Sequence, residues 1–354
     1  MLQIWVDKFF LYGGLIQVLD RSLDLKLNAT IVGSRLLFST VIGRLECRHI
    51  IPVDIAAFVS PVWFAWDPLL PYLTAVLLLA VGVSIAIKNA PPQASALDKV
   101  ILCGPVFIAI PMAVFGTEHF LDPAGVGGII PAWIPAHVFW AYLVGACLMF
   151  GALSIVFQKN ARLPAGLFGV MLLLFEALMH VPRIVAGPHN RLSWAIALRD
   201  LFFSCGALSF AATGTNEWKT KGTHWLITVA RFLIGIVLIF FAAEHFLHPE
   251  VAPGVPLRQL TPAWIPGHLL WSYLTGAVFV LAGVCLIVNK GVCFAVTSVG
   301  LWVLFLVIII CVPIAVQHGS DIGSGLNNPV DTLLLSGAAL CLAATQREKL
   351  GARS

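Results

Sequence analysis

Long apolar segments separated by short polar loops dominate this chain. A helix needs about 20 mostly apolar residues to cross a bilayer, and nine segments reach or approach that length. They are residues 69–88, 99–121, 133–157, 163–182, 193–213, 226–247, 264–288, 292–316 and 329–345. The strict alternation of apolar and polar residues that half-buried strands require is missing. The pattern therefore predicts an all-α integral membrane protein with about nine spans, whose solvent is the lipid bilayer.

Much of the pattern occurs twice. Residues 118–121 and residues 244–247 both read EHFL, and PAWIPAH at 131–137 matches PAWIPGH at 262–268. From there the spacing stays at 131 residues without gaps. We therefore predict two tandem four-helix units, the first over residues 99–214 and the second over residues 225–346. Four is an even number of crossings, so both units should point the same way across the membrane, as in a parallel repeat.

The remaining segments are assigned by their position around this repeat. Residues 61–98 should form a lone helix that resembles the second helix of each unit, followed by a linker. Residues 347–354 should form a basic tail, and residues 1–60 an N-terminal segment of uncertain structure. Because residues 28–50 contain Arg35 and Arg44, this segment is either a poor extra span, an interfacial amphipathic stretch, or an N-terminus that is not authentic.

The loop charges predict an orientation. Lysine and arginine next to spans mark the cytoplasmic side, and they gather in one set of loops and in the C-terminal tail. These cations are Lys88, Lys99, Lys159, Arg162, Lys219, Lys221, Lys290, Arg347, Lys349 and Arg353. We expect a cell-membrane protein with a cytoplasmic C-terminus, in which both EHFL corners face outward.

Composition agrees with this class of protein. The chain is 59% apolar and 11% charged, whereas soluble domains are roughly 45–50% apolar and about 25% charged. A net charge of +4 is too small to indicate nucleic acid as a partner. The eight cysteines show no C-x-x-C spacing, and we interpret them as small packing residues.

The candidate ligand-binding residues lie at the predicted outer ends of the helices. Eight of the ten histidines fall at these ends or in the outer loops: His119, His137, His180, His189, His245, His248, His268 and His318. Imidazole can bind a metal, move a proton or donate a hydrogen bond to a quinone carbonyl. If the first two helices of each unit are neighbours, ligand sites form at Glu118, His119, His137 and Trp140 and at Glu244, His245, His268 and Trp271. The alternative is that headgroups and water satisfy these polar helix ends.

The first unit has two further ionisable groups. Glu176 and His180 lie four residues apart and therefore share a helix face. Glu176 should lie roughly 20 Å from the inner end of its helix, at 1.5 Å per residue. Ionisable groups at such depth indicate function, so we expect the first unit to hold the active site, with metal ligands possible at His119, His137 and His180. The alternative is a pair with His180 or with an arginine that only packs helices. Asp200 and Asp331 are interpreted as structural residues in a first helical turn.

The two units resemble the DoxX-like family of small four-helix membrane proteins. The resemblance rests on residues 231–247, 262–288 and 327–343 and on their counterparts in the first unit, with the pattern P-x-W-x-P, Y-x-x-G and D-x-x-L-x-x-x-A-x-x-L. Arg231 fits the family pattern, whereas the first unit has Pro105 there. The family includes a subunit of thiosulfate:quinone oxidoreductase, so the resemblance implies a redox or quinone-linked role. It transfers no catalytic residue, because many members have no known activity.

Three functional hypotheses follow. The first is a quinone-linked redox subunit with a partner subunit, whose outward His/Glu site binds quinone, haem or a metal. The second is a carrier for a small solute, or an assembly scaffold, without enzymatic activity. The third is a helix bundle that binds no ligand. The sequence does not decide whether the protein is an enzyme.

Overall fold

The computed structural model describes residues 66–213, 221–317 and 326–351. Within these ranges, nine helical stretches are long and apolar enough to cross a membrane, which confirms the predicted all-α multi-pass membrane protein. The predicted segment over residues 1–60 and the start of the lone helix at residues 61–65 lie outside the described residues.

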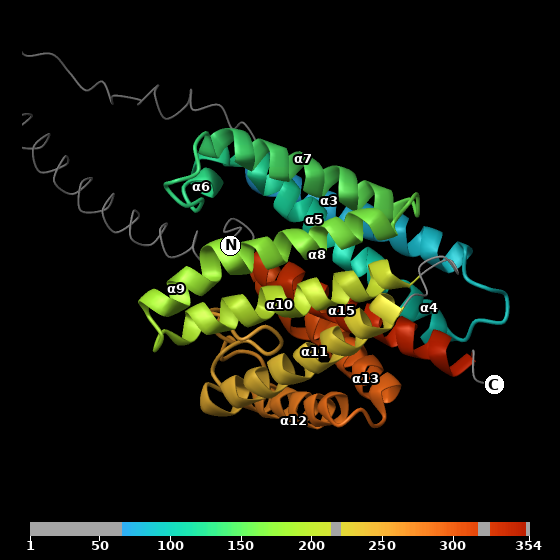
Figure 1. Ribbon diagram of the computed structural model, residues 1–354. Coiled ribbons are helices and arrows are strands. Elements are labelled where there is room, and N and C mark those ends of the chain that lie inside the picture. Colours follow the sequence, from blue (N-terminus) through green and yellow to red (C-terminus); the bar gives the residue numbers. More distant parts are fainter. Residues whose placement is uncertain (1–65, 214–220, 318–325, 352–354) are drawn as a thin grey trace, which may run out of the picture. The chain divides into compact units, whose positions relative to one another are not determined.

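The helices follow one another in the order that the sequence predicts (Figure 1). Before and within the first unit they are α3 (Trp66–Lys88), α4 (Ala96–Leu102), α5 (Gly104–Leu121), α6 (Pro123–Gly127), α7 (His137–Val156), α8 (Arg162–Phe175), η1 (Glu176–His180), α9 (Val181–Ala186) and α10 (Arg191–Ala212). Within the second they are α11 (Lys221–Leu247), α12 (His268–Ile287), α13 (Val292–Leu306), η3 (Val307–Cys311), α14 (Val312–Gln317) and α15 (Asn327–Gly351).

Backbone features recur at the same 131-residue spacing as the sequence. The π-helical turns η1 and η3 occupy corresponding positions. The residues before α7 and α12, Ala136 and Gly267, are both left-handed, with φ of 58° and 65°. The turns after α7 and α12 also repeat, because Gln158 and Asn289 have φ of 55° and 56°. These matches support the prediction of two related units.

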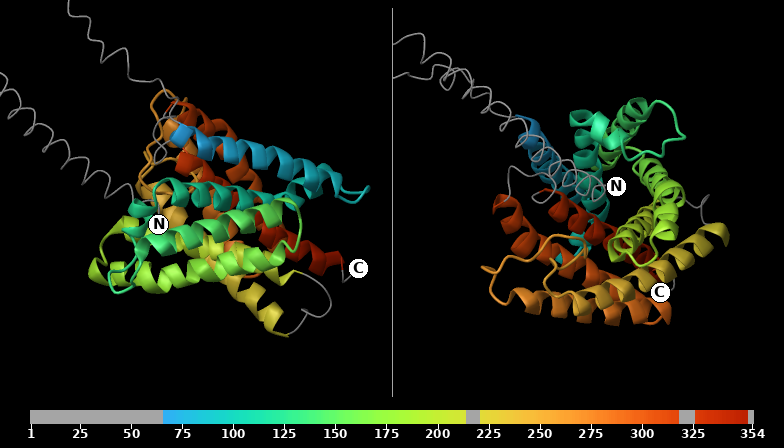
Figure 2. Two further views of the ribbon diagram at one scale, coloured as in Figure 1. Left: turned by 90° about the horizontal axis from the view of Figure 1, so that it is seen from above. Right: turned by 90° about the vertical axis from the view of Figure 1, so that its left-hand side faces the viewer.

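The last helix of each unit lies at the centre of the packing. α10 contacts α8 of its own unit and α11 and α15 of the other, and α15 contacts α5, α10 and α13 (Figure 1; Figure 2). α10 and α15 are also the two least apolar of the nine spans. The most hydrophilic spans are thus kept away from lipid, where polar side chains are most costly.

Small residues permit the close approach of these helices. A Cβ atom added to Gly206 of α10 would lie 2.2 Å from the Cβ of Ala338 on α15. A Cβ at Gly145 of α7 would lie 2.7 Å from the Cβ of His119 on α5. In a bilayer, where water does not drive helices together, such contacts supply much of the packing energy.

The second helix of each unit begins later than predicted. The sequence placed these helices from residues 133 and 264, whereas α7 begins at His137 and α12 at His268. Pro135 and Pro266 explain the difference, because a proline disfavours the α conformation of the residue before it. The left-handed residue that follows each proline then forms the helix boundary. His137 and His268 are therefore the first helical residues.

Candidate functional site

A π-helical turn shapes the surroundings of Glu176 and His180. The N–H of Val181 donates to the carbonyl oxygen of Glu176, five residues back, instead of to the residue four back. Pro182 follows immediately and has no N–H to donate, so the regular ladder is interrupted at this level of the helix. Single π turns inside α-helices occur frequently at functional sites. The turn begins at Glu176 and ends at His180, the two residues for which the sequence predicts an intramembrane site.

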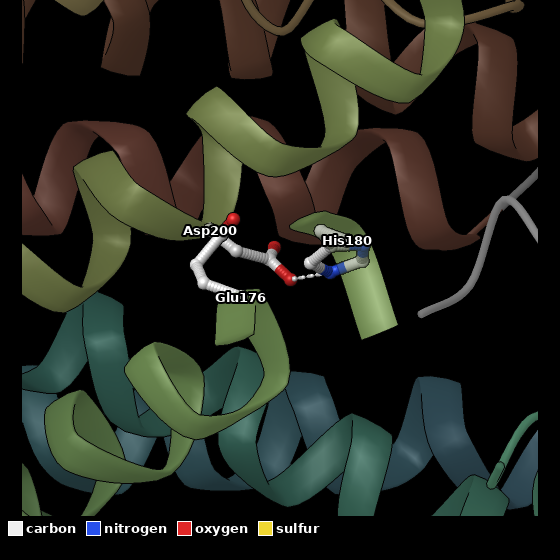
Figure 3. Close-up of side chains that lie close together, drawn as sticks. All are labelled: Glu176, His180 and Asp200. Carbon is white, nitrogen blue, oxygen red and sulfur yellow. Dashed lines mark hydrogen bonds and ion pairs between the residues drawn. The ribbon is translucent and has the colours of Figure 1, made fainter. Parts of the chain in front are cut away.

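Across from this turn, α10 contributes Asp200. Nε2 of His180 donates to Oδ2 of Asp200 at 3.0 Å, and both side chains are buried. Glu176 extends from η1 towards the Asp200 carboxylate (Figure 3). One ligand atom from each of Glu176, His180 and Asp200 lies within 4.8 Å of the others. We call these three residues the central triad.

Arg199 connects the central triad to the second unit. Its Nε donates to Oδ1 of Asp200 at 2.8 Å, and another of its nitrogens donates to Oδ2 of Asp331 on α15 at 2.9 Å. All three side chains are only 4% exposed, so water screens these pairs weakly. The two aspartates occupy corresponding positions of the repeat, and one arginine joins them. This arginine is not repeated, because Val330 takes its place in the second unit.

The cluster contains more acid than base. Glu176, Asp200 and Asp331 provide three carboxyl groups, and Arg199 is their cationic neighbour. Oε1 of Glu176 and Oδ1 of Asp331 are buried and have no hydrogen-bond partner in the described part of the chain. A buried acceptor without a partner costs about 1–3 kcal/mol. The arrangement therefore places more carboxyl groups than cations inside the bundle and leaves two of their acceptor oxygens without a partner among the described residues.

The predicted outer site of the second unit is held by internal contacts. Arg191 pairs with the Glu244 carboxylate and donates to the carbonyl oxygen of Leu257 at 3.0 Å. Nδ1 of His245 donates to the carbonyl oxygen of Phe241 at 2.6 Å, and its Nε2 accepts from the N–H of Gly254 at 3.0 Å. Nε2 of His245, and Glu244 through Arg191, thus fix the loop after α11, whereas Nδ1 of His245 is bound within the helix. These contacts leave neither ring nitrogen of His245 free for a ligand.

The corresponding corner of the first unit differs. Nδ1 of His119 also donates to a backbone carbonyl, that of Phe115, at 2.6 Å. The Glu118 side chain is half-buried. Its Oε1 atom is buried and has no hydrogen-bond partner among the described residues. The carboxyl groups of Glu118 and Asp331 repel each other when both are ionised. Glu118 thus belongs to the surroundings of the buried cluster through its electrostatic coupling to Asp331.

The tryptophan and histidine candidates at the starts of α7 and α12 remain near the surface. His137 and His268 are half-buried. Trp140 and Trp271 each donate their indole N–H to a proline carbonyl oxygen, that of Pro135 or Pro266, at 3.1 Å. These bonds fix the turns before the two helices.

The expected metal site at His119, His137 and His180 does not form. Among the described residues, the group with ligand spacing is Glu176, His180 and Asp200. The prediction was wrong because it grouped residues by their distance from helix ends. Burial and packing instead draw His180 towards α10.

Three partners of the site were not predicted as functional. Asp200 and Asp331 were interpreted as helix-start residues, and Arg199 was assigned no functional role. A signal was present, because an arginine and a repeated aspartate interrupt an otherwise apolar span. Their convergence depends on how α10 packs against α15, which the sequence pattern does not reveal.

Comparison with known proteins identifies no relative. No family model, no curated protein and no solved structure matches the chain.

Proposed function

We propose that this multi-pass membrane protein is a carrier for a small cationic solute, and that the central triad is its solute site. The observation that supports this proposal most directly is the excess of carboxyl groups over Arg199 in the middle of the bundle. Intramembrane carboxylates are costly and mark the paths of ions or substrates. Two acceptor oxygens without partners would receive the charge of the solute.

The helices around the triad also support a carrier. Discontinuous helices are typical of solute sites in transporters. The span that consists of α8 and α9 is interrupted at the triad by the π turn η1 and by the proline that follows it. The site lies where the last helices of both units meet. A relative movement of the two units would therefore change the surroundings of the triad from both sides. We place the protein in the cell membrane with its C-terminus in the cytoplasm, following the loop charges.

A current measurement tests this proposal. The full-length chain would be reconstituted in liposomes and exposed to Na⁺, K⁺, methylammonium, guanidinium and Mn²⁺ on a solid-supported membrane. We expect a charge-movement signal with at least one of these cations, reduced about tenfold or more, equivalent to ~1.4 kcal/mol, by Glu176→Gln.

The control variant is Glu250→Gln, which removes an exposed carboxylate and should leave the signal unchanged. The carrier proposal fails if no cation gives a signal, or if both variants reduce it equally.

A second candidate function concerns other residues. An open hollow at the start of α7 is lined by residues 132 and 134–139 and includes the imidazole of His137 beside apolar side chains. Apolar walls with one hydrogen-bonding group suit a quinone ring, and the DoxX-like resemblance favours the same role. In that case the protein would be a quinone-linked redox subunit with a partner subunit. Quinone extraction and an optical spectrum of the purified protein that both show no redox group would eliminate this candidate.

A further inference from the structure

We infer that the solute of the proposed carrier is a divalent transition-metal ion, bound by the carboxylates of Glu176 and Asp200 and by Nε2 of His180. The inference rests on the proposed function for the identity of the site, but metal binding can be measured without transport. The three ligand atoms already lie within 4.8 Å of one another. Ligands that bind a metal at about 2.0–2.2 Å are separated by roughly 3–4 Å, so small side-chain movements complete the site.

The donor set determines the class of metal. One imidazole with two carboxylates suits Mn²⁺, Fe²⁺, Co²⁺ or Zn²⁺, whereas Ca²⁺ and Mg²⁺ prefer oxygen ligands alone. Sulfur ligands, which Cu⁺ prefers, are absent from the group. The set therefore favours divalent ions of intermediate hardness.

The surrounding residues fit a divalent charge. Glu176, Asp200 and Asp331 contribute three negative charges when ionised and Arg199 contributes one positive charge. Glu118 adds a further carboxyl group next to Asp331, so the excess of negative charge is at least two when these groups are ionised. A divalent ion offsets more of this excess than a monovalent ion does. The buried Oε1 of Glu176, without a partner among the described residues, is an independent sign that this carboxyl group can accept a bound cation.

Arg199 acts as a positioning residue for the metal ligands. It holds Oδ1 of Asp200 at 2.8 Å, which leaves Oδ2 directed at His180. Metal-binding carboxylates are usually held by such outer hydrogen bonds. The Nε2–Oδ2 hydrogen bond requires a proton on Nε2. Coordination requires Nε2 without it, so the neutral imidazole carries its proton on Nδ1 when the metal is bound.

Manganese binding tests this inference directly. The purified full-length chain in detergent would be titrated with Mn²⁺ and followed by electron paramagnetic resonance. We expect one Mn²⁺ per chain, with the pulsed spectrum showing coupling to one coordinated imidazole nitrogen. Glu176→Gln should weaken binding by about 100-fold or more, because loss of an outer partner alone costs about 10–100-fold. His180→Gln should abolish the nitrogen coupling, which a purely structural role would not do.

The second unit offers a matched control. Cys311 occupies the position that corresponds to His180 and lies outside the central triad. Cys311→Ala should therefore leave both the affinity and the nitrogen coupling unchanged.

The outcomes separate the two proposals. If wild-type protein binds neither Mn²⁺, Co²⁺ nor Zn²⁺, the metal inference is overturned, whereas a current with methylammonium or guanidinium would still support a carrier. Binding of Mn²⁺ without nitrogen coupling overturns it as well. Specific Mn²⁺ binding without any current supports the metal site and removes the carrier. The wild-type measurements decide these cases even if a variant fails to fold.

Discussion

Arg199 is a single residue on which the electrostatics of the bundle depend. It pairs with Asp200 on its own helix and with Asp331 on α15, and all three side chains are buried. Removing one member of such a group leaves uncompensated charge in a medium that solvates it poorly. Its partners are repeated in the sequence, whereas the arginine occurs only in the first unit.

We expect Arg199→Met to destabilise the protein by about 3–5 kcal/mol, the usual cost of leaving buried partners unpaired. Arg199→Lys should recover only part of this stability, because an ammonium lacks the planar fork that reaches both carboxylates. Chemical unfolding in detergent, followed by tryptophan fluorescence, measures the difference.

Arg162→Met, at an exposed position at the start of α8, is the control and should change stability by less than about 0.5 kcal/mol. Equal, small losses for Arg199→Met and Arg162→Met would show that the Arg199 pairs are energetically unimportant.

Glu176 and His180 show how far single residues could be understood from the sequence. Their four-residue spacing and their depth in an apolar segment indicated an intramembrane site, and the structure places both in the central triad. The sequence did not indicate Asp200 as their partner. Nothing in a linear pattern shows which face of α10 meets η1.

At the scale of elements, the close packing of α10 on α15 positions the site. Gly206 lies against the backbone and the side chain of Ala338, so that an added Cβ would be 2.5 Å from its Cα and 2.2 Å from its Cβ. The helix axes can approach this closely only without a side chain on one of them. The distance between Asp200 and Asp331, and hence the reach of Arg199, depends on this contact.

Gly206→Ala should therefore cost about 1–3 kcal/mol, as expected for overpacking a filled interface. Ala338→Gly in the same chain should restore part of the loss, because it removes the nearest atom. Thermal unfolding of the purified variants provides the measurement.

The comparison for Gly206→Ala is Gly187→Ala, where the nearest atoms to an added Cβ are 3.9 Å away. If the two variants unfold at the same temperature, the tight α10–α15 contact does not stabilise the bundle.

The π turns η1 and η3 are elements that the sequence pattern missed. Apolar periodicity continues through both of them, so residues 163–182 and 292–316 were predicted as regular helices. Val181-Pro182 and Val312-Pro313 mark the positions, since a proline removes one donor from the ladder. Whether the helix then widens to a π turn or bends depends on its neighbours.

At the scale of the whole molecule, nine apolar stretches among the described residues form a multi-pass protein, in which the last helices of the two units, α10 and α15, contact each other. If each unit crosses the membrane four times, as the sequence predicts, both EHFL corners face the same side of the membrane. The loops after α7 and α12 then face the opposite side.

Cysteine labelling of intact cells tests this topology. In a background without native cysteines, Ala124→Cys and Glu250→Cys should react with a membrane-impermeant maleimide, because both positions are exposed and follow the two EHFL corners. Lys159→Cys and Lys290→Cys, exposed in the two corresponding opposite loops, should react only after the cells are opened. Reaction of Ala124→Cys and Glu250→Cys from opposite sides would exclude a parallel arrangement.

The sequence by itself determined the class of the protein, the number and order of its spans within the described residues, and two members of the buried site. These features depend on the length, apolarity and spacing of segments, all of which can be read directly along the amino-acid sequence. Tertiary structure alone decided that Asp200, Arg199 and Asp331 meet Glu176 and His180, and that Glu244 and His245 fix a loop. Such contacts depend on how helices rotate and approach, and many residues far apart in the sequence contribute to that packing energy.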